Sequence, residues 1–502
     1  MKRSRQFFRN TAVGYALVAA NVGFTILSVP LALRYLGKEE FGLWALAQQI
    51  GGYFLLIDLG ITSAMSRLLA NHKDDIDGGA YGSLLLTGGI VFAVQGVLLA
   101  VFGTLFAFAA PQLFNVPDAL AADFRNVLVI LSLQSGAAIA LRSITAPLWA
   151  FQRLDVSYAF GITSLVGGLA FLWMGFHAGL GVYSFPLAGI PPMIVCGFFG
   201  LTFCYRNKFY PNSGAWGRPH WAAFKEMLSF GKDVMLMTIG SQLVNASQVM
   251  ILGRVAGLEA AATFAIGTKF YAFGGQLTGR LVESSAPALT EMYVRGENER
   301  LRGRFFDIFR TSLFLATTGA VALVAANSMA IGWWTSGMIH WRFSWDILIG
   351  LLLLATTVSR CLIGLFGITG NLRPVRNVYL GEALLFVAIG VPAATWFQIP
   401  GLLAASLMAQ LLVTLQYSVV ASNRFIKSIK PLKSAAFTAA GIFAIAAVAS
   451  AFCYDRNLIG SLIGAGTIVF LATIASGIAI LSSEAKQSAF AQARGILGLR
   501  TY

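Results

Sequence analysis

The sequence predicts an all-α polytopic membrane protein with about fourteen transmembrane helices. Three observations predict this class: the composition, the length of the apolar runs and the distribution of lysine and arginine. The 502 residues are 57% hydrophobic and 11% charged, with a mean hydropathy of +0.73, whereas soluble domains carry about 25% charged residues. Many apolar runs are near 20 residues long, which a helix needs to cross a bilayer. Alternating ten-residue strands, typical of membrane barrels, are absent from the sequence.

The first apolar run, 11–33, follows a basic N-terminus. It is longer than the apolar region of a signal peptide and ends in Arg34 rather than at a small-residue cleavage site, so we expect a retained helix. Thirteen further runs of similar character follow. The predicted spans are 11–33, 41–64, 82–109, 125–148, 157–177, 181–204, 233–253, 260–288, 309–331, 346–369, 377–396, 399–421, 434–452 and 458–481.

The distribution of basic residues predicts the orientation of these spans in the membrane. With the N-terminus inside, alternating segments place 27 Lys and Arg in inside segments and 6 in outside loops, out of 36 in total. Cytoplasmic loops of membrane proteins show this enrichment, so both termini are expected in the cytoplasm. The net charge of +15 then reflects topology and contact with anionic membrane lipids, and no nucleic-acid partner is expected.

The residues of common catalytic and metal sites are scattered along the chain. The four cysteines form no CxxC pair, the four histidines lie far apart, and no GxxxxGK[ST] phosphate loop occurs. We therefore expect no cofactor, no metal site and no enzymatic activity. A membrane polysaccharide polymerase or ligase, the enzyme alternative, would need a large outside loop, and the longest predicted one spans only about 110–123.

A short repeat divides the chain. Arg34–Glu39 has the spacing R-x-x-G-x-E, and Arg254–Glu259 repeats it 220 residues later. Six spans separate the copies, so they share one membrane orientation, as parallel repeats do. The repeat predicts two six-helix lobes around a central cavity, followed by a C-terminal pair. The predicted parts are an N-lobe 1–205, a cytoplasmic linker 206–232, a C-lobe 233–421, an extra pair 434–481 and a cytoplasmic tail 482–502.

An N-terminal block adds a family resemblance. It reads Leu33-Arg34-Tyr35-Leu36-Gly37, then Gly42, Asp58-Leu59-Gly60 and Arg67-Leu68-Leu69-Ala70. Together with the two lobes and small loops, it resembles the polysaccharide-flippase (Wzx-like) branch of the multidrug/oligosaccharidyl-lipid/polysaccharide (MOP, MATE-like) exporter superfamily.

The resemblance implies a bacterial inner-membrane flippase for surface polysaccharide biosynthesis. Such a protein turns a polyprenyl-pyrophosphate-linked oligosaccharide from the inner to the outer leaflet by alternating access. Its implied partners are the lipid-linked oligosaccharide, membrane lipids and enzymes of polysaccharide biosynthesis. The alternative in the same class is a cation-coupled small-molecule (multidrug) exporter, whose cavity should be dominated by carboxylates.

Charged residues inside spans are costly and usually face a cavity or a partner. Arg280 and Glu283 are three residues apart on the eighth span, with Lys269 and Gln276 on nearly the same face. Because guanidinium binds phosphate in a fork, we expect Arg280 and Lys269 to bind the substrate's phosphates, with Glu283 and Asp58 supporting them. The alternative is an Arg280–Glu283 pair that only stabilises its helix.

Other polar residues in spans leave two readings open. Asp58 is also a candidate coupling group that takes up a proton or Na⁺, and the alternative is a capped or paired carboxylate near the inner half of its span. Asn21, Gln242, Asn245 and Gln276 are candidate sugar contacts, and for the amides of the first and seventh spans the alternative is helix-to-helix hydrogen bonding. Arg360 and Glu382, on neighbouring spans, are expected to neutralise each other.

Overall fold

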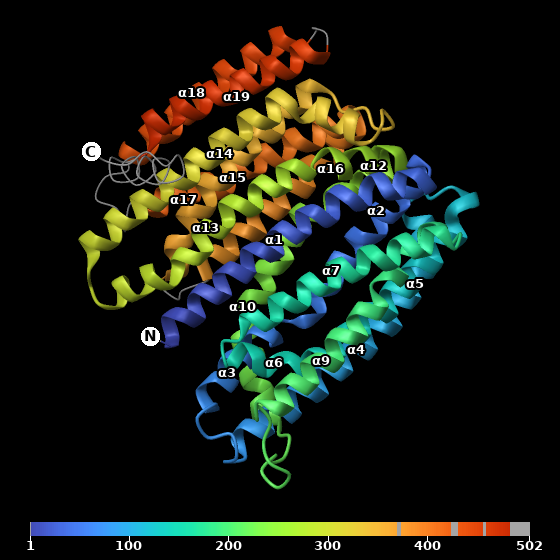
Figure 1. Ribbon diagram of the computed structural model, residues 1–502, viewed down its shortest axis with the longest axis vertical. Coiled ribbons are helices and arrows are strands. Elements are labelled where there is room, and N and C mark those ends of the chain that lie inside the picture. The colour runs from blue at the N-terminus through green and yellow to red at the C-terminus, as the bar shows by residue number, and fades with distance from the viewer. Residues whose placement is uncertain (1, 369–372, 423–429, 455–457, 482–502) are drawn as a thin grey trace, which may run out of the picture. The chain divides into compact units, whose positions relative to one another are not determined.

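The computed structural model describes residues 2–368, 373–422, 430–454 and 458–481 (Figure 1). Over these ranges the chain is helical between short turns and contains no strand, so the all-α prediction is confirmed. The predicted tail 482–502 lies outside the described residues. The chain forms two compact units, Met1–Ala262 and Thr263–Tyr502. The lobe boundaries at 205 and 233 stay a prediction, and the helix of the seventh predicted span belongs to the first unit by its contacts.

The first unit is built from long helices with two sharp bends. In it α4 packs along α5, and α1 packs along α7 (Figure 1). Its helices are α1 (Lys2–Tyr35), α2 (Lys38–Tyr53), η1 (Phe54–Asp58), α3 (Ile61–His72), α4 (Ala80–Leu113), α5 (Asp118–Ala140), α6 (Arg142–Ala150), α7 (Leu154–His177), η2 (Gly181–Tyr183), α8 (Ser184–Ala188), α9 (Ile190–Arg206), α10 (Trp221–Asn245), α11 (Ser247–Val255) and the start of α12 (Leu258–Gly267).

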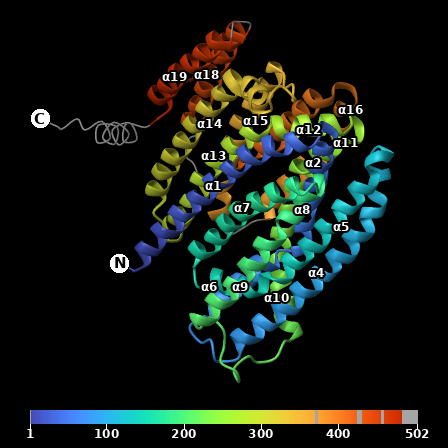
Figure 2. The same ribbon diagram turned by 45° about the vertical axis from the view of Figure 1, so that its right-hand side comes forward.

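The second unit contains the remaining helices. In it α14 packs against α13 and α15, and the C-terminal helices α18 and α19 lie side by side next to α14 (Figure 2). Its helices are the end of α12, α13 (Lys269–Val294), α14 (Asn298–Trp334), α15 (Phe343–Ile368), α16 (Arg373–Ala409), the π-helix η3 (Gln410–Leu415), α17 (Gln416–Ser422), α18 (Lys430–Tyr454) and α19 (Leu458–Ile480).

Ten of the described helices are long and apolar enough to cross a membrane, or up to twelve if each of two bent pairs forms one span. The polytopic membrane class is therefore confirmed, and the predicted count of about fourteen differs at two places. Arg373–Ser422 counts as one apolar stretch, although two helices meet within it at a kink at Gln398. The helix α13 is absent from the apolar set, because its lysine, arginine and glutamates lower its hydropathy.

The two copies of the R-x-x-G-x-E turn lie close together in the first unit. In each copy a new helix, α2 or α12, begins directly after the glycine. Lys38 Nζ lies 3.6 Å from Glu259 Oε1. A Cβ on Gly42 would lie 2.0 Å from the Leu258 carbonyl oxygen. Gly42 of the family-like block is therefore required for the backbone of α2 to approach the start of α12.

Candidate functional site

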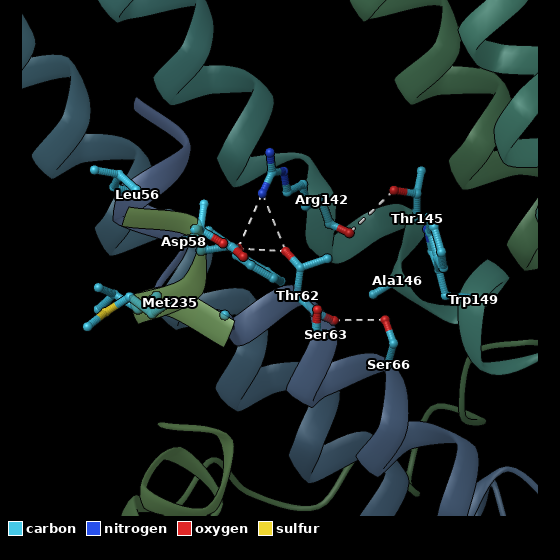
Figure 3. Close-up of a pocket in the computed structure, with 14 residues that line it drawn as sticks. Leu56, Asp58, Thr62, Ser63, Ser66, Arg142, Thr145, Ala146, Trp149 and Met235 are labelled. Carbon is cyan, nitrogen blue, oxygen red and sulfur yellow. Dashed lines mark hydrogen bonds and ion pairs between the residues drawn. The ribbon is translucent and has the colours of Figure 1, made fainter. Parts of the chain in front are cut away.

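A polar cavity of about 440 Å³ lies in the first unit, where two spans are broken (Figure 3). The first break separates η1 from α3 with a bend of 42°, and the second separates α5 from α6 with a bend of 45°. Broken helices expose backbone and polar side chains that a continuous span would hide, and they form binding sites in membrane transporters. The lining residues are Leu56, Asp58, Leu59, Gly60, Thr62, Ser63, Ser66, Phe92, Arg142, Thr145, Ala146, Trp149, Met235 and Thr238.

An ion pair joins the two breaks inside this cavity. Arg142 Nη1, at the start of α6, lies 3.2 Å from Asp58 Oδ1, at the end of η1. Thr62 Oγ1 donates to the same Asp58 oxygen at 2.6 Å and accepts from Arg142 Nη1 at 3.4 Å. The side chains are 32% and 17% exposed for Arg142 and Asp58. The pair is thus partly shielded from solvent yet open to the cavity.

The hydrogen bonds leave one edge of the Arg142 guanidinium available. Both bonds donated by its side chain to described residues come from Nη1. A guanidinium carries five N–H donors in a planar fork, so Nε and Nη2 have donors that no described side chain or carbonyl accepts. This edge can bind two oxygens of a phosphate or carboxylate at once.

A compact core holds the cavity walls in place. Residues of α3, α4 and α6, including Met65, Tyr81 and Ala150, are almost fully buried against each other and against Met227 of α10. Apolar burial of this kind contributes roughly 1.5–3 kcal/mol per large side chain. The short helix α6 is therefore fixed on its core side, which leaves its other side to line the cavity.

The first break is stabilised by close backbone packing. Leu59 and Gly60 both have positive φ values, 49° and 73°. A Cβ on Gly60 would lie 2.5 Å from the carbonyl oxygen of Gly231 on α10. The Asp58-Leu59-Gly60 motif therefore bends the span and allows α10, which carries Met235 and Thr238, to close one side of the cavity.

The segment after α9, predicted as a linker, is bound to the first unit. Tyr210 Oη donates to the carbonyl oxygen of Ile144 on α6 at 2.6 Å, and burial raises the pKa of Tyr210, which keeps this hydroxyl a donor. Asp77 accepts from the backbone and side-chain nitrogens of Asn212 at 2.8 and 2.7 Å. Ser83 Oγ donates to the Arg218 carbonyl oxygen at 2.5 Å. These bonds tie the segment to α6 and α4.

Of the predicted site residues in the first unit, the structure brings Asp58 into the cavity. Gln242 Nε2 donates to the Gly52 carbonyl oxygen at 3.0 Å, which joins α10 to α2, the helix-to-helix alternative. Asn245 donates to Ser241 one turn earlier in the same helix. The side chain of Asn21 is partly buried in α1.

The predicted residues of the second unit lie on α13. Arg280 Nη1 lies 3.4 Å from Glu283 Oε2, and their side chains are 40% and 69% exposed. The expected local pair is therefore present, while contact with phosphate stays a prediction. Lys269 and Gln276 lie on the same helix, and both are partly exposed.

Arg360 and Glu382 form no direct ion pair within 4 Å in the described part of the second unit. Arg360 instead donates to the Gly275 carbonyl oxygen at 2.9 Å, and Glu382 accepts a short hydrogen bond from Thr414 in the π-helix. Arg360 and Glu382 thus do not neutralise each other through direct contact, contrary to the expectation.

Arg142 is a cavity residue that was not predicted, because it falls near the inner end of the predicted span 125–148. The available signal was the polar sequence Arg142-Ser143-Ile144-Thr145 directly after an apolar run. A break in a span at that point places polar residues around a cavity rather than in a loop.

A second hollow, of about 470 Å³, lies in the second unit and is apolar. Leucine, valine, alanine and phenylalanine from α14, α15, η3, α17 and α18 form most of its wall, and Lys433 is the one charged residue among those that line it. Such a groove suits a hydrocarbon chain, with the lysine near the first turn of α18 suited to an acidic group.

Comparison with known proteins identifies the family of the chain. Residues 7–292 match the model of a family described as polysaccharide biosynthesis protein. The chain therefore belongs to the polysaccharide biosynthesis protein family, and the expected resemblance to the Wzx-like branch of the MOP exporters is confirmed.

Particular relatives are distant. An uncharacterized membrane protein, EpsK, of Bacillus subtilis (strain 168) is 23% identical over 310 residues, which cover 59% of this chain and 59% of that protein. The lipid II flippase MurJ in an inward closed conformation is 14% identical with a TM-score of 0.69, over 93% of this chain and 98% of that one. An inward-facing multidrug resistance MATE family transporter of the MOP superfamily is 10% identical with a TM-score of 0.66, over 80% and 94%. The chain shares the fold of these two solved structures.

Proposed function

We propose that this protein flips a polyprenyl-pyrophosphate-linked oligosaccharide from the inner to the outer leaflet of the bacterial inner membrane, with both termini in the cytoplasm. The observation that carries the proposal is the open guanidinium edge of Arg142 in the polar cavity of the first unit. Membership of the polysaccharide biosynthesis family supports a substrate that contains sugar.

The Asp58–Arg142 pair suits binding and release of an anion. An isolated charge within a span is costly, by about 3 kcal/mol near its centre, and Asp58 offsets this cost when no substrate is present. A diphosphate that reaches Nε and Nη2 gains a bidentate contact without first breaking the Nη1 bond to Asp58. Arg142 can therefore hold the substrate while the cavity is exposed first to one side and then to the other.

The apolar groove of the second unit supports a lipid-linked substrate over a soluble one. A polyprenyl chain is hydrocarbon along its whole length, and the groove presents the leucine, alanine and phenylalanine side chains that would exclude water from it. The phosphate contacts expected for Arg280 and Lys269 belong to the same proposal.

A cation-coupled multidrug exporter is less well supported by the cavity. Among the described residues that line the cavity, Asp58 is the one carboxylate, and it accepts hydrogen bonds from Arg142 and Thr62. A cationic drug that approached this carboxylate would be repelled by the neighbouring guanidinium of Arg142.

Leaflet-specific labelling tests the function. In cells that lack the protein, lipid-linked oligosaccharide should accumulate in the inner leaflet, out of reach of an external sugar-modifying reagent. Wild-type protein should restore labelling. Arg142→Lys, which keeps the charge but loses the fork, should restore it only in part, while Arg206→Ala, at an exposed arginine of the same unit, should restore it fully. Normal labelling in cells without the protein would refute the proposal, and export of cationic dyes instead would favour the drug exporter.

A further inference from the structure

One side of α6 carries a second feature besides Arg142. Arg142, Thr145 and Trp149 are spaced by three and four residues, so they share one face of the helix, and all three line the polar cavity (Figure 3). Trp149 is 47% exposed, whereas its neighbours Leu148 and Ala150 are 0% and 1% exposed. The indole is thus exposed where α6 borders the hollow, and its two neighbours in sequence are buried.

Hydroxyl groups stand around the same hollow. Ser66 Oγ donates to the Thr62 carbonyl oxygen at 2.8 Å, and Thr145 Oγ1 donates to that of Arg142 at 3.4 Å. Both oxygens therefore keep lone pairs that can accept hydrogen bonds. Ser63, exposed at the start of α3, also lines the cavity, and its hydroxyl can donate or accept.

An exposed indole beside several hydroxyls has the chemistry that binds a sugar ring. The apolar face of a pyranose packs on an aromatic ring, and its hydroxyls exchange hydrogen bonds with neighbouring oxygens. The spacing also fits a sugar joined to a diphosphate, because two helical turns, about 10 Å of rise, separate Arg142 from Trp149. The cavity volume of about 440 Å³ lies within the range of roughly 300–1,000 Å³ that small-molecule sites occupy.

We propose that Trp149 stacks on the first sugar of the lipid-linked oligosaccharide, the ring attached to the diphosphate, and that Ser63, Ser66 and Thr145 bind its hydroxyls. This subsite rests on the proposed function, in which Arg142 binds the diphosphate. It makes Trp149 a specificity-determining residue that separates sugar-bearing carrier lipid from the bare carrier diphosphate, so that empty carrier is not transported outward.

Binding to two kinds of probe tests the subsite. The full chain, purified in lipid nanodiscs, is titrated with farnesyl diphosphate and with farnesyl diphosphate carrying N-acetylglucosamine or galactose. Wild-type protein should bind at least one sugar-bearing probe about tenfold more tightly than the bare probe. Trp149→Ala should lose this difference and keep the affinity for bare farnesyl diphosphate, and Trp149→Phe should retain most of the difference.

The controls separate the two proposals. Arg142→Ala combined with Asp58→Asn should weaken all probes alike, and thermal melting of each variant checks its fold. A Trp149→Ala protein that still prefers the sugar-bearing probe would overturn the subsite while leaving the flippase proposal intact. Wild-type protein that binds none of the probes would instead count against the proposed function, as would probe affinities that are unchanged when Arg142 is removed.

Discussion

Two arginine–carboxylate pairs in this protein differ in how they are made. Arg280 and Glu283 lie three residues apart on α13, with side chains 40% and 69% exposed. Asp58 and Arg142 lie 84 residues apart, meet where two helices break, and are 17% and 32% exposed. The first pair follows from helical periodicity, and the second exists only because the fold brings two breaks together.

The difference bears on what each pair can do. A local, exposed pair contributes about 0.3–0.5 kcal/mol to its helix and can be broken at little cost. A partly buried tertiary pair holds two elements together, and removal of one partner leaves a charge with poor solvation. We therefore expect the Asp58–Arg142 pair to control both the shape of the cavity and the binding of an anion.

The largest effect is expected from removing the cavity pair as a whole. Arg142→Ala with Asp58→Asn should lower export on the order of a hundredfold, because charge-assisted hydrogen bonds to a diphosphate contribute about 1.5–3 kcal/mol each. The double substitution leaves no uncompensated charge, so the melting temperature should stay near that of the wild type. Leaflet labelling and thermal melting measure the two quantities. Near-normal export in this variant would show that Arg142 does not bind the diphosphate of the substrate.

Arg280→Ala should have the next largest effect if the cation of α13 also contacts the substrate, as the sequence predicts. Loss of one such contact should reduce export about tenfold, with little change in stability because its pair with Glu283 is exposed. The matched control is Arg295→Ala, which removes an exposed i,i+4 pair with Glu291 near the end of the same helix. Full export in Arg280→Ala would mean that the Arg280–Glu283 pair only stabilises its helix.

The contrast between the local pair and the tertiary pair also explains which parts of the site could be predicted from the sequence. The helical class, the Arg280–Glu283 pair and the importance of Asp58 depend on hydropathy and on spacing along one helix, and such local patterns can be read directly. The partner of Asp58 could not be read in this way. It depends on positive φ at Leu59 and Gly60 and on the packing of Gly60 against Gly231, which are tertiary features.

The span count shows the same limit. By length and composition Arg373–Ser422 is one apolar helical stretch, with a kink at Gln398. In the sequence, Pro400-Gly401 marks a turn at this place and so predicts two spans. In contrast, hydropathy alone treats α2, η1 and α3 as one predicted span and gives no sign of its bend of 42°. Apolar runs therefore predict which segments cross the membrane better than they predict where those segments break.

A smaller effect is expected from Asp58→Asn alone. It removes the negative charge beside Arg142 that repels an incoming anion, and it keeps an acceptor oxygen for Nη1, so inorganic pyrophosphate should bind about fivefold more tightly, in line with roughly 1 kcal/mol for a partly exposed pair. Slower release should then lower the export rate. Calorimetric titration of the purified protein measures the affinity. Weaker pyrophosphate binding would mean that the orientation of the guanidinium by the Asp58 carboxylate matters more than the repulsion between this carboxylate and the anion.

The smallest effect tests the comparison itself. Glu283→Gln should change the free energy of unfolding by less than about 0.5 kcal/mol, because the pair it breaks is local and exposed to solvent. A double-mutant cycle over Arg280 and Glu283 should give a coupling energy of the same small size. A matched cycle over Asp58 and Arg142 should give a coupling energy about two to three times larger, because that pair is partly buried and both partners hydrogen-bond to Thr62. Denaturant melts of the four single and two double variants measure both couplings. Equal couplings would mean that burial at the helix breaks does not strengthen the Asp58–Arg142 pair. The pair would then matter only because Asp58 fixes the direction in which the open edge of the Arg142 guanidinium points.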